Sequence, residues 1–534
     1  MSGVLHGWSG ILMAYSAVQG PMIAGMMRAR AQLHQYVLSP IVAAPLTALA
    51  AASAAMLPSY GLLQAAVATG VSAVLGYAGG CAIARGVEDR LHQRGSLVAE
   101  RLPPANAQFD RASASAGITL AGIQVPAQDE TKHFKLIGTT GTGKSTAIRE
   151  IMASALTRGD RAVIADPDGG YMRRFYQKDR GDIILNPFDE RSVKWNLFAE
   201  IKNAPDVEQL ARSLIPDHDG QDRSWRAYAR TFFTAVTRRA HAAGVSDVGE
   251  LYRLLVVADA SELRLLVRGT SAQPFLDEQN SRMFDSIRSV TSSAVGALDY
   301  VAQQKTASFS VREWVKEDKP GVLFIPYKAG QIAALRSTVS GWMRLAIFET
   351  MDRGEQNSSL WFVVDELDAL GQIDGLKDAL ARLRKFNGRC VLGFQSIAQV
   401  SSTYGQGDAH TIVENCGNTL ILRCSASEGG GTARFASQLI GEREVLRTTL
   451  SRSRRVTEMS GSVSRTQHFT VEAAVLPSQV EQLPDLTGYL KYASDATWQR
   501  VRLDARNAWQ GLRSSHPAAA RANDGRRGMD VDHE

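Results

Sequence analysis

A glycine-rich loop between an apolar strand and a helix constrains the fold of this chain more than any other sequence feature. The pattern G-x-x-x-x-G-K-[ST] runs from Gly138 to Ser145. The residues before it, Phe134 to Ile137, predict a buried strand, and apolar residues spaced three and four apart after Lys144 predict a helix. Glycines in such a loop let successive backbone N–H groups face phosphate oxygens. The sequence therefore predicts a P-loop, and the alternative is a glycine-rich turn with a solvated lysine.

Each position of this loop has an expected role in binding a nucleotide. Lys144 supplies a positive charge to the β- and γ-phosphates, and the hydroxyl of Ser145 is placed to ligate Mg²⁺. The expected cofactors are therefore ATP and Mg²⁺. The predicted nucleotide-binding residues are Gly138, Thr139, Thr140, Gly141, Thr142, Gly143, Lys144, Ser145 and Thr146.

A second candidate element lies downstream, in the apolar run LWFVVDEL of residues 360–367. A buried parallel strand has this pattern, and carboxylates at its end emerge at the ligand crevice of the sheet. We expect Asp365 to hold Mg²⁺, through a water molecule, and Glu366 to orient or deprotonate the attacking water. The alternative interpretation is a helix N-terminus with capping acids.

Five further apolar runs predict strands, and helical patterns separate them. These runs cover residues 161–169, 181–189, 321–327, 389–396 and 418–424, and two of the helices are expected over 331–352 and 374–387. This alternation predicts an α/β fold with a mostly parallel sheet and helices on both faces. Gln395 is a polar residue at the end of one run. It either contacts the γ-phosphate and couples hydrolysis to movement, or simply ends a strand in a turn.

Residues 203–319 show helical spacing of apolar residues and no convincing strand pattern. They predict an all-helical domain inserted into an α/β domain whose two parts are 131–202 and 320–505. The insertion contains a set of basic residues that either faces DNA or belongs to a solvated helix face. The set consists of Arg223, Arg226, Arg230, Arg238 and Arg239.

No Asp, Glu, Lys or Arg occurs between Ala31 and Ala84. This stretch divides at a Pro-Ser-Tyr-Gly turn into two apolar segments, 37–57 and 62–84, each about the 20 residues that a membrane helix needs. We therefore expect a transmembrane hairpin over 36–84, with a pair of alanine-rich core helices as the alternative. Arginines flank the hairpin on both sides and its loop has no charge, which predicts both ends in the cytoplasm.

The remaining segments carry weaker signals. Residues 1–35 are expected to be a cytoplasmic or interfacial segment, with an interfacial helix preferred over a third span. Residues 85–130 are expected to be a linker with a short charged helix over 87–102, and residues 506–534 a flexible tail.

The composition excludes several classes of protein. The chain has 534 residues, of which 44% are hydrophobic and 21% charged, so it is not largely disordered and is long for one domain. Its four cysteines form no C-x-x-C pair, which excludes a disulfide scaffold and disfavours a structural zinc site. The net charge of +6 permits binding to nucleic acid or an anionic membrane.

These features, in this order, resemble the type IV coupling proteins of bacterial conjugation and type IV secretion, the TraD/TrwB type. The resemblance rests on the N-terminal hairpin and on the strings GTTGTGKS, DIILNPFDERSVKWN, LWFVVDELDAL, RLRKFNGRCVLGFQSIAQVSSTYG and LPSQVEQLPDLTGYL. It implies a RecA-like hexameric ATPase that is anchored in the bacterial inner membrane, with its motor and C-terminus in the cytoplasm. It also implies single-stranded DNA as the substrate, delivered by a relaxase and its relaxosome to a type IV secretion channel.

The resemblance also implies roles for single residues. Lys144 and Ser145 match the Walker A residues of the family, and Asp365 and Glu366 match Walker B. A further match is Arg384, which corresponds to the family's arginine finger; this side chain reaches the nucleotide of the neighbouring subunit. Lys385 beside it leaves that assignment open by one residue. Gln395 matches the glutamine of the family's next strand. Two features depart from the family pattern, namely the four-residue loop of the hairpin and the lack of a long acidic C-terminal extension.

Two other functions share parts of this pattern. An FtsK-like duplex DNA translocase has the same type of motor, but too few residues follow Asp504 for a folded DNA-orienting domain, and the chain has two predicted spans rather than a larger set. A secretion ATPase that moves only protein is the other alternative, and the chain has no LSGGQ-type signature. Stimulation of ATP hydrolysis by single-stranded DNA, duplex DNA or neither distinguishes the three.

Overall fold

The computed structural model describes residues 2–28, 33–55, 69–83, 94–95, 98–100, 117–217, 222–352, 358–427, 430–453 and 462–505. The chain divides into two compact units. The smaller unit consists of Met1–Ser96 and Glu442–Ala473, and the larger one of Leu97–Gly441 and Ala474–Glu534.

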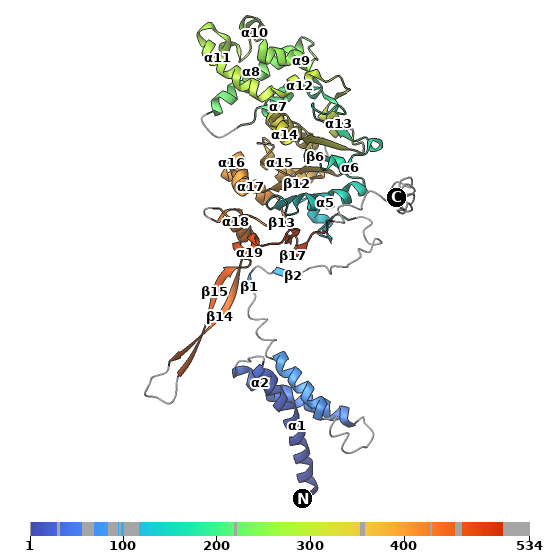
Figure 1. Ribbon diagram of the computed structural model, residues 1–534, viewed down its shortest axis with the longest axis vertical. Coiled ribbons are helices and arrows are strands. Elements are labelled where there is room, and N and C mark those ends of the chain that lie inside the picture. Colours follow the sequence, from blue (N-terminus) through green and yellow to red (C-terminus); the bar gives the residue numbers. More distant parts are fainter. Residues whose placement is uncertain are drawn as a thin grey trace, which may run out of the picture. The chain divides into compact units, whose positions relative to one another are not determined.

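A ten-stranded mixed sheet forms the centre of the larger unit, with the strand order β2–β17–β16–β13–β5–β12–β11–β6–β10–β7 (Figure 1). From β13 to β7 neighbouring strands are parallel, whereas β16 pairs antiparallel with both β13 and β17. The bounds are β2 (Val98–Glu100), β5 (Phe134–Ile137), β6 (Arg161–Pro167), β7 (Ile183–Ile184), β10 (Val322–Tyr327), β11 (Leu360–Val364), β12 (Gly388–Phe394), β13 (Asn418–Ile421), β16 (Thr487–Lys491) and β17 (Trp498–Arg502). Each run predicted as a strand contains one, and the predicted α/β fold is confirmed.

The side chains of the central strands alternate between two hydrophobic clusters, as the period of two along a strand requires. In β6, Val163 and Ala165 belong to one cluster, which also contains residues of α14 (Ala329–Asp352) and α15 (Leu376–Leu383). Their neighbours Ala162 and Ile164 belong to the other cluster, together with the apolar side of α5 (Lys144–Arg158). Helices therefore cover both faces of the sheet.

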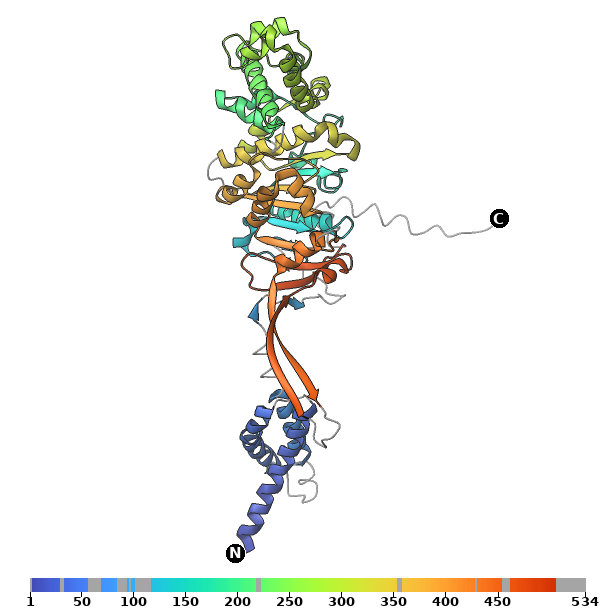
Figure 2. The same cartoon turned by 90° about the vertical axis from the view of Figure 1, so that its left-hand side faces the viewer.

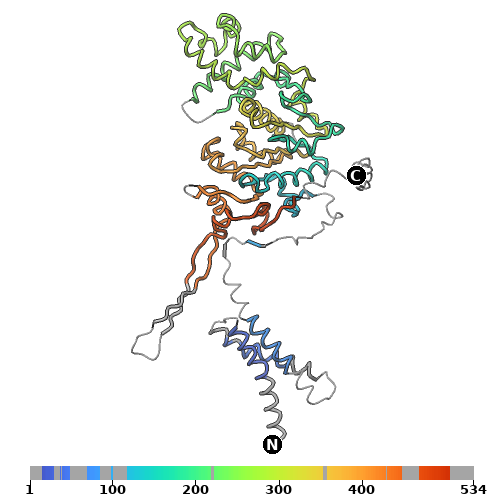
Figure 3. The backbone as a smooth tube through the Cα atoms, viewed as in Figure 1, coloured from blue at the N-terminus to red at the C-terminus, as the bar shows by residue number. Residues whose placement is uncertain are grey.

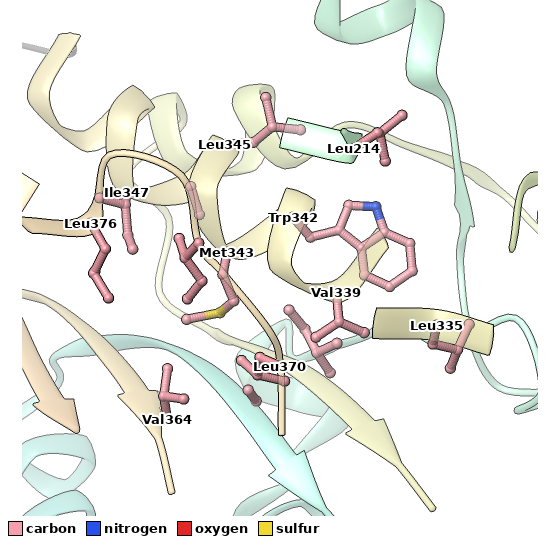
Figure 4. Packing of buried hydrophobic residues seen from close by; sticks show 14 of the residues in the cluster. Leu214, Leu335, Val339, Trp342, Met343, Leu345, Ile347, Val364, Leu370 and Leu376 are labelled. Atoms are coloured by element: carbon pink, nitrogen blue, oxygen red, sulfur yellow. The ribbon is translucent and has the colours of Figure 1, made fainter. Parts of the chain in front are cut away.

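Helix α14 packs between the sheet and the helical segment that precedes it in the chain. Its residues Val339, Trp342 and Met343 are buried, and Figure 4 shows them between Leu214 and Val364 of β11. The ring of Trp342 meets that of Trp195 edge-on, with 5.7 Å between the ring centroids. The sheet and the helical segment therefore share one hydrophobic core.

The described residues between Ala204 and Lys316 are almost entirely helical, and Figure 3 shows their backbone as a group of coils, coloured from green to yellow-green. The helices of this segment are α7 (Ala204–Leu214), α8 (Arg223–Ala242), α9 (Val248–Tyr252), α10 (Ala260–Leu266), α11 (Ser281–Val295), α12 (Ala297–Gln303) and α13 (Val311–Lys316). A capping box of Asn203 and Asp206 begins α7. The two-residue strands β8 (Lys194–Trp195) and β9 (Ser308–Phe309) pair in parallel and bring the two ends of the segment together, although no strand was expected at β9.

Three of the five arginines considered for a DNA-facing set contact other parts of this segment. Arg230 pairs with Asp217, Arg238 pairs with Glu208, and Arg239 donates to a backbone carbonyl oxygen. These contacts favour the interpretation of an ordinary solvated helix face for those three side chains.

The larger unit also contains short helices and strands outside the ten-stranded sheet and the helical segment. They are β3 (Thr119–Leu120), β4 (Ile123–Gln124), α4 (Ala127–Glu130), α6 (Met172–Phe175), α16 (Ile397–Tyr404), α17 (Gln406–Asn415), α18 (Gly431–Ile440) and α19 (Pro477–Glu481). Single-turn elements complete the set, and one of them, the 3₁₀ turn η6 (Arg384–Phe386), directly precedes β12.

In the smaller unit, a long antiparallel ribbon of β14 (Glu442–Ser453) and β15 (Ser462–Ala473) has β1 (Arg94–Gly95) as a third strand. Figure 2 shows how the two long strands twist around each other. The helix predicted over 87–102 is wrong wherever that segment is described, because β1 and β2 are strands. Open strand edges offer backbone hydrogen bonds that override a weak helical pattern, and β2 takes such an edge on β17.

Three N-terminal helices pack together in the smaller unit: α1 (Ser2–Arg28), α2 (Leu33–Ala55) and a helix over 69–83. A Cβ atom on Gly80 would lie 2.1 Å from the backbone oxygen of Met22, so this crossing requires glycine. Gln19 of α1 donates to the hydroxyl of Ser39 in α2 at 2.8 Å. The first segment, expected as an interfacial helix, thus belongs to the same bundle as residues of the two predicted spans.

None of the described helices combines the length and the apolar character of a membrane span. The predicted loop of the hairpin falls within residues 56–68, outside the described residues, as does the predicted tail 506–534.

Candidate active site

The P-loop connects the carboxyl end of β5 to the first residue of α5. Gly141 and Gly143 have φ angles of +79° and +120°, which side chains rarely allow. Gly138 has no space for a side chain, since a Cβ atom there would lie 2.9 Å from both the Leu422 Cβ and the Thr142 Oγ1. The conformation of the loop therefore requires glycine at these three positions.

Threonine hydroxyls hold the loop in this conformation. The Thr142 hydroxyl donates to the backbone oxygen of Thr139 at 2.7 Å. The Thr139 hydroxyl donates to the backbone oxygen of Arg423 at 3.2 Å. Thr146 is half-buried in the first turn of α5. The loop is thus fastened to itself and to the chain that follows β13.

The side chain of Lys144 folds back onto the loop. Its Nζ donates to the backbone oxygens of Gly138 at 2.6 Å and Thr139 at 3.3 Å. Burial lowers the pKa of Lys144, and the charges of Asp365 and Glu366 oppose that shift. A buried ammonium with two neutral carbonyl partners is a ready partner for phosphate oxygens, because charge-assisted hydrogen bonds are stronger.

Asp365 lies one residue beyond β11, next to Ser145. The Ser145 hydroxyl donates to its Oδ2 at 2.6 Å, and the hydroxyl of Tyr171 donates to the same oxygen at 2.7 Å. Burial is the main cause that raises the pKa of Tyr171 well above its usual value, so its hydroxyl stays protonated. The other oxygen of Asp365, Oδ1, is buried and has no hydrogen-bond partner among the described residues.

This donor set fits a magnesium ion. Mg²⁺ prefers hard oxygen ligands and is usually bound by one or two protein groups together with phosphates and water. The hydroxyl of Ser145 and the unpartnered Oδ1 of Asp365 supply such oxygens next to the P-loop. The residues therefore suit a nucleotide with Mg²⁺.

The side chain of Gln395 contacts two other predicted site residues, Glu366 and Thr140. Its Nε2 donates to Oε1 of Glu366 at 3.1 Å, and its Oε1 accepts the hydroxyl of Thr140 at 3.0 Å. Glu366 is half-buried. Burial is the largest cause that raises its pKa, and the charges of Asp365 and Asp368 add to that shift. A carboxylate whose pKa is raised toward neutrality is suited to accept a proton.

Arg384 does not join this group. It is exposed in η6, before the amino end of β12, whereas the P-loop follows the carboxyl end of β5. Because β5 and β12 are parallel neighbours, Arg384 lies at the amino ends of these strands and the P-loop at their carboxyl ends. Seven residues of β12 separate its two ends, which corresponds to roughly 20 Å. Lys385 is exposed beside it.

Two residues at this site were not assigned a role from the sequence, Tyr171 and Asp166. Asp166 is buried near the end of β6 and accepts backbone hydrogen bonds from Tyr171 and Met172. Burial raises its pKa to about 6, although these hydrogen bonds lower it. An acid at the end of an apolar strand was the signal that identified Asp365, and the same signal marks Asp166. No comparable signal marks Tyr171.

The family follows from a comparison with known proteins. A family model described as the type IV secretion-system coupling protein DNA-binding domain matches residues 117–504. The chain belongs to this family. The resemblance predicted from the sequence is thereby confirmed.

Curated proteins of Escherichia coli are similar over most of this chain. The coupling protein TraD of Escherichia coli (strain K12) is 31% identical over 380 residues, which are 70% of this chain and 52% of TraD. A conjugal transfer protein TraG of Escherichia coli is 23% identical over 401 residues, 66% of this chain and 62% of TraG. The chain thus spans about half the length of TraD.

Solved coupling-protein structures have the same fold. The bacterial conjugative coupling protein TrwBdeltaN70, in an unbound form, matches with a TM-score of 0.67 and 30% identity, over 78% of this chain and 94% of the solved chain. TrwB in complex with ADP and Mg²⁺ matches with a TM-score of 0.66 and 29% identity, over the same shares. TrwB has also been solved with a non-hydrolysable ATP analogue.

Proposed function

We propose that this chain is a DNA-dependent ATPase that moves single-stranded DNA from a relaxosome to a type IV secretion channel. The observation that carries the proposal is the hydrogen-bonded series Thr140–Gln395–Glu366, which joins the P-loop, β12 and the Walker B carboxylate. Such a series lets the state of the nucleotide change the position of a strand. It occurs in a chain that matches the DNA-binding domain of coupling proteins over residues 117–504.

The side chains of the site have distinct parts in the proposed hydrolysis. Lys144 leaves its two carbonyl partners and binds the β- and γ-phosphates of ATP. Ser145 and Asp365 would hold Mg²⁺, which would offset the negative charge of the phosphates. Glu366 accepts the proton of the attacking water, and Gln395 orients Glu366 for that step. The proposed cofactors ATP and Mg²⁺ are supported by the complexes of the similar protein TrwB.

The proposed assembly is a RecA-like homo-hexamer. Arg384 lies at the sheet edge opposite its own P-loop, so its guanidinium is better placed for the nucleotide of a neighbouring subunit than for its own. A planar, permanently charged guanidinium suits a phosphoryl group in transfer. Its proposed role is that of an arginine finger.

We place the protein in the bacterial inner membrane, with its motor and C-terminus in the cytoplasm. The support is the stretch between Ala31 and Ala84, which has no charged residue and is flanked by arginines. The proposed partners are a relaxase with its relaxosome proteins on the cytoplasmic side and the components of the secretion channel at the membrane. The similarity to TraD supports both.

ATP hydrolysis by the full chain in detergent, measured with different DNA, tests this function. We expect single-stranded DNA to stimulate hydrolysis most, and Lys144→Ala to abolish hydrolysis with every DNA. Lys178→Ala, at an exposed lysine, serves as the control. Stronger stimulation by duplex DNA would favour an FtsK-like translocase, and no stimulation by either would favour a secretion ATPase that moves only protein. Conjugative transfer that survives Lys144→Ala would refute the motor function.

A further inference from the structure

A buried tyrosine contacts the Walker B carboxylate from outside both Walker motifs. Tyr171 is 2% exposed, and its hydroxyl lies 2.7 Å from Oδ2 of Asp365. That oxygen has two donors, Tyr171 and Ser145, whereas Oδ1 is buried and lacks a partner in the part of the chain that the structure describes. The carboxylate therefore has one oxygen that is held and one that is left for a further ligand.

Neighbouring groups hold the backbone at Tyr171 and contact its ring. Its backbone N–H donates to Oδ1 of Asp166 at 3.0 Å, and that of Met172 donates to Oδ2 at 2.7 Å, so that one buried carboxylate fixes the start of α6. The guanidinium of Arg149, on α5, lies 5.7 Å from the centre of the ring. Tyr171 thus connects the end of β6 and the P-loop helix to the end of β11.

We propose that Tyr171 is a positioning residue for the magnesium site, where its hydroxyl holds Oδ2 of Asp365 and so presents Oδ1 to the cation. The inference rests on the proposed function, since it concerns the cation that accompanies the nucleotide. The hydroxyl of Ser145 is itself an expected ligand of Mg²⁺, so it cannot also hold Asp365 when the ion is bound. The hydroxyl of Tyr171 has no other expected role and can hold Asp365 in either state. Partners of this kind, which orient a metal ligand, typically contribute about 10- to 100-fold to metal affinity.

Nucleotide binding, measured with a fluorescent ADP at increasing Mg²⁺ and in EDTA, tests the inference without relying on hydrolysis. In Tyr171→Phe we expect the half-saturating Mg²⁺ concentration to rise about tenfold, while the affinity in EDTA stays unchanged. Tyr327→Phe is the matched control, because Tyr327 is also buried and its hydroxyl has no partner in the described parts of the chain. We expect it to behave as the wild type.

A double-mutant cycle shows whether Tyr171 acts through Asp365. In the Asp365→Asn background, Tyr171→Phe should cause no further rise in the half-saturating Mg²⁺ concentration. Additive effects would overturn the inference, as would an unchanged Mg²⁺ dependence in Tyr171→Phe or an equal loss of affinity in EDTA. A wild-type chain that binds the nucleotide without any dependence on Mg²⁺, or not at all, would overturn the proposed function as well.

Discussion

Gln395 donates a hydrogen bond from its Nε2 to Oε1 of Glu366, at a distance of 3.1 Å. The Oε1 of the same amide accepts the hydroxyl of Thr140, at 3.0 Å. One side chain therefore contacts both the P-loop and the carboxylate that is proposed as the base. A change at either of them alters the hydrogen bonds of the other.

We expect Gln395→Ala to bind ATP as the wild type does but to hydrolyse it about 10- to 100-fold more slowly. A hydrogen bond to a charged group contributes roughly 1.5–3 kcal/mol, and its loss leaves Glu366 without its orienting partner. The measurement is kcat with and without single-stranded DNA, and the stimulation by DNA should also fall. Gln399→Ala, at an exposed position of α16, is the control. An unchanged kcat in Gln395→Ala would contradict the coupling role.

Glu366→Gln should retain ATP rather than hydrolyse it. The substitution removes the proposed base and leaves Asp365 and Ser145 in place, so binding persists while turnover falls by about 10²–10⁴. Bound ATP that survives gel filtration, together with single-turnover rates, measures both effects. Glu414→Gln, at an exposed glutamate, should behave as the wild type. If the Glu366 variant turned over normally, the base would have to be another residue.

Mixing two inactive variants tests whether Arg384 acts on a neighbouring subunit. Arg384→Ala and Lys144→Ala should each be inactive alone, since a finger of this type contributes roughly 10³–10⁵ to the rate. In mixed rings an intact Arg384 can serve a neighbour's intact P-loop, so the mixture should recover hydrolysis. Lys385→Ala shows which of the two neighbouring residues acts on the nucleotide, because it should stay active if Arg384 is the finger. No recovery in any mixture would remove the main support for action between subunits.

Removal of residues 1–90 should separate the proposed membrane anchor from the proposed motor. The deletion takes away the charge-free stretch but leaves β1, which pairs with β14, in the chain. We expect the shortened protein to stay in solution without detergent and to be mostly monomeric, with hydrolysis limited to the rings that it forms, whereas the full chain sediments with membranes. Fractionation and size-exclusion chromatography measure this. A full chain that partitions with the soluble fraction would contradict the anchor.

His133 should make stability fall on mild acidification. Its ring is buried, accepts a hydrogen bond from the Cys390 N–H and donates to the Leu380 carbonyl, so only the neutral form fits. Burial is the main cause that lowers its pKa from 6.5 to about 4. Between these values the unfolded chain binds more protons than the folded one. The contribution of His133 to the free energy of unfolding is therefore fully present above pH 6.5 and is lost as the pH falls toward 4. At pH 5 the free energy of unfolding is lower by about 2 kcal/mol.

His133→Asn provides the test, because asparagine tolerates the φ of +54° at this position. Urea unfolding of the wild type and the variant at pH 7 and pH 5 should show that the variant loses about 2 kcal/mol less on acidification. His241→Asn, at an exposed histidine, controls for the loss of one histidine. Equal losses in all three proteins would exclude His133 as the cause.

The parts of the site that could be predicted are those that follow an apolar strand. Lys144, Asp365, Glu366 and Gln395 all lie at or just beyond such runs, and the carboxyl ends of parallel strands meet at one edge of a sheet. Their mutual proximity therefore follows from the pattern of strands alone. Tyr171 could not be predicted, because its hydroxyl reaches a carboxylate 194 positions away in the sequence. Only the fold brings these two together.

The elements that escaped prediction depend on pairing between distant segments. The strands β14 and β15 carry charged and polar residues at most positions, so no apolar face marks them. The short strands β1 and β2 exist because β14 and β17 offer open edges. A local pattern cannot show such partners, and for this reason the segment 87–102 resembled a helix.

The position of β12 has a consequence for communication around a ring. It lies between β5 and β11, with Gln395 directly after its carboxyl end and Arg384 shortly before its amino end. If Arg384 serves the adjacent subunit, then β12 connects two nucleotide sites. Gln395 at one end contacts the site of its own subunit, and Arg384 at the other end reaches the site of the neighbour. Hydrolysis would then be reported from each subunit to one neighbour and not to the other. Such a ring would therefore have a fixed order in which neighbouring subunits hydrolyse ATP.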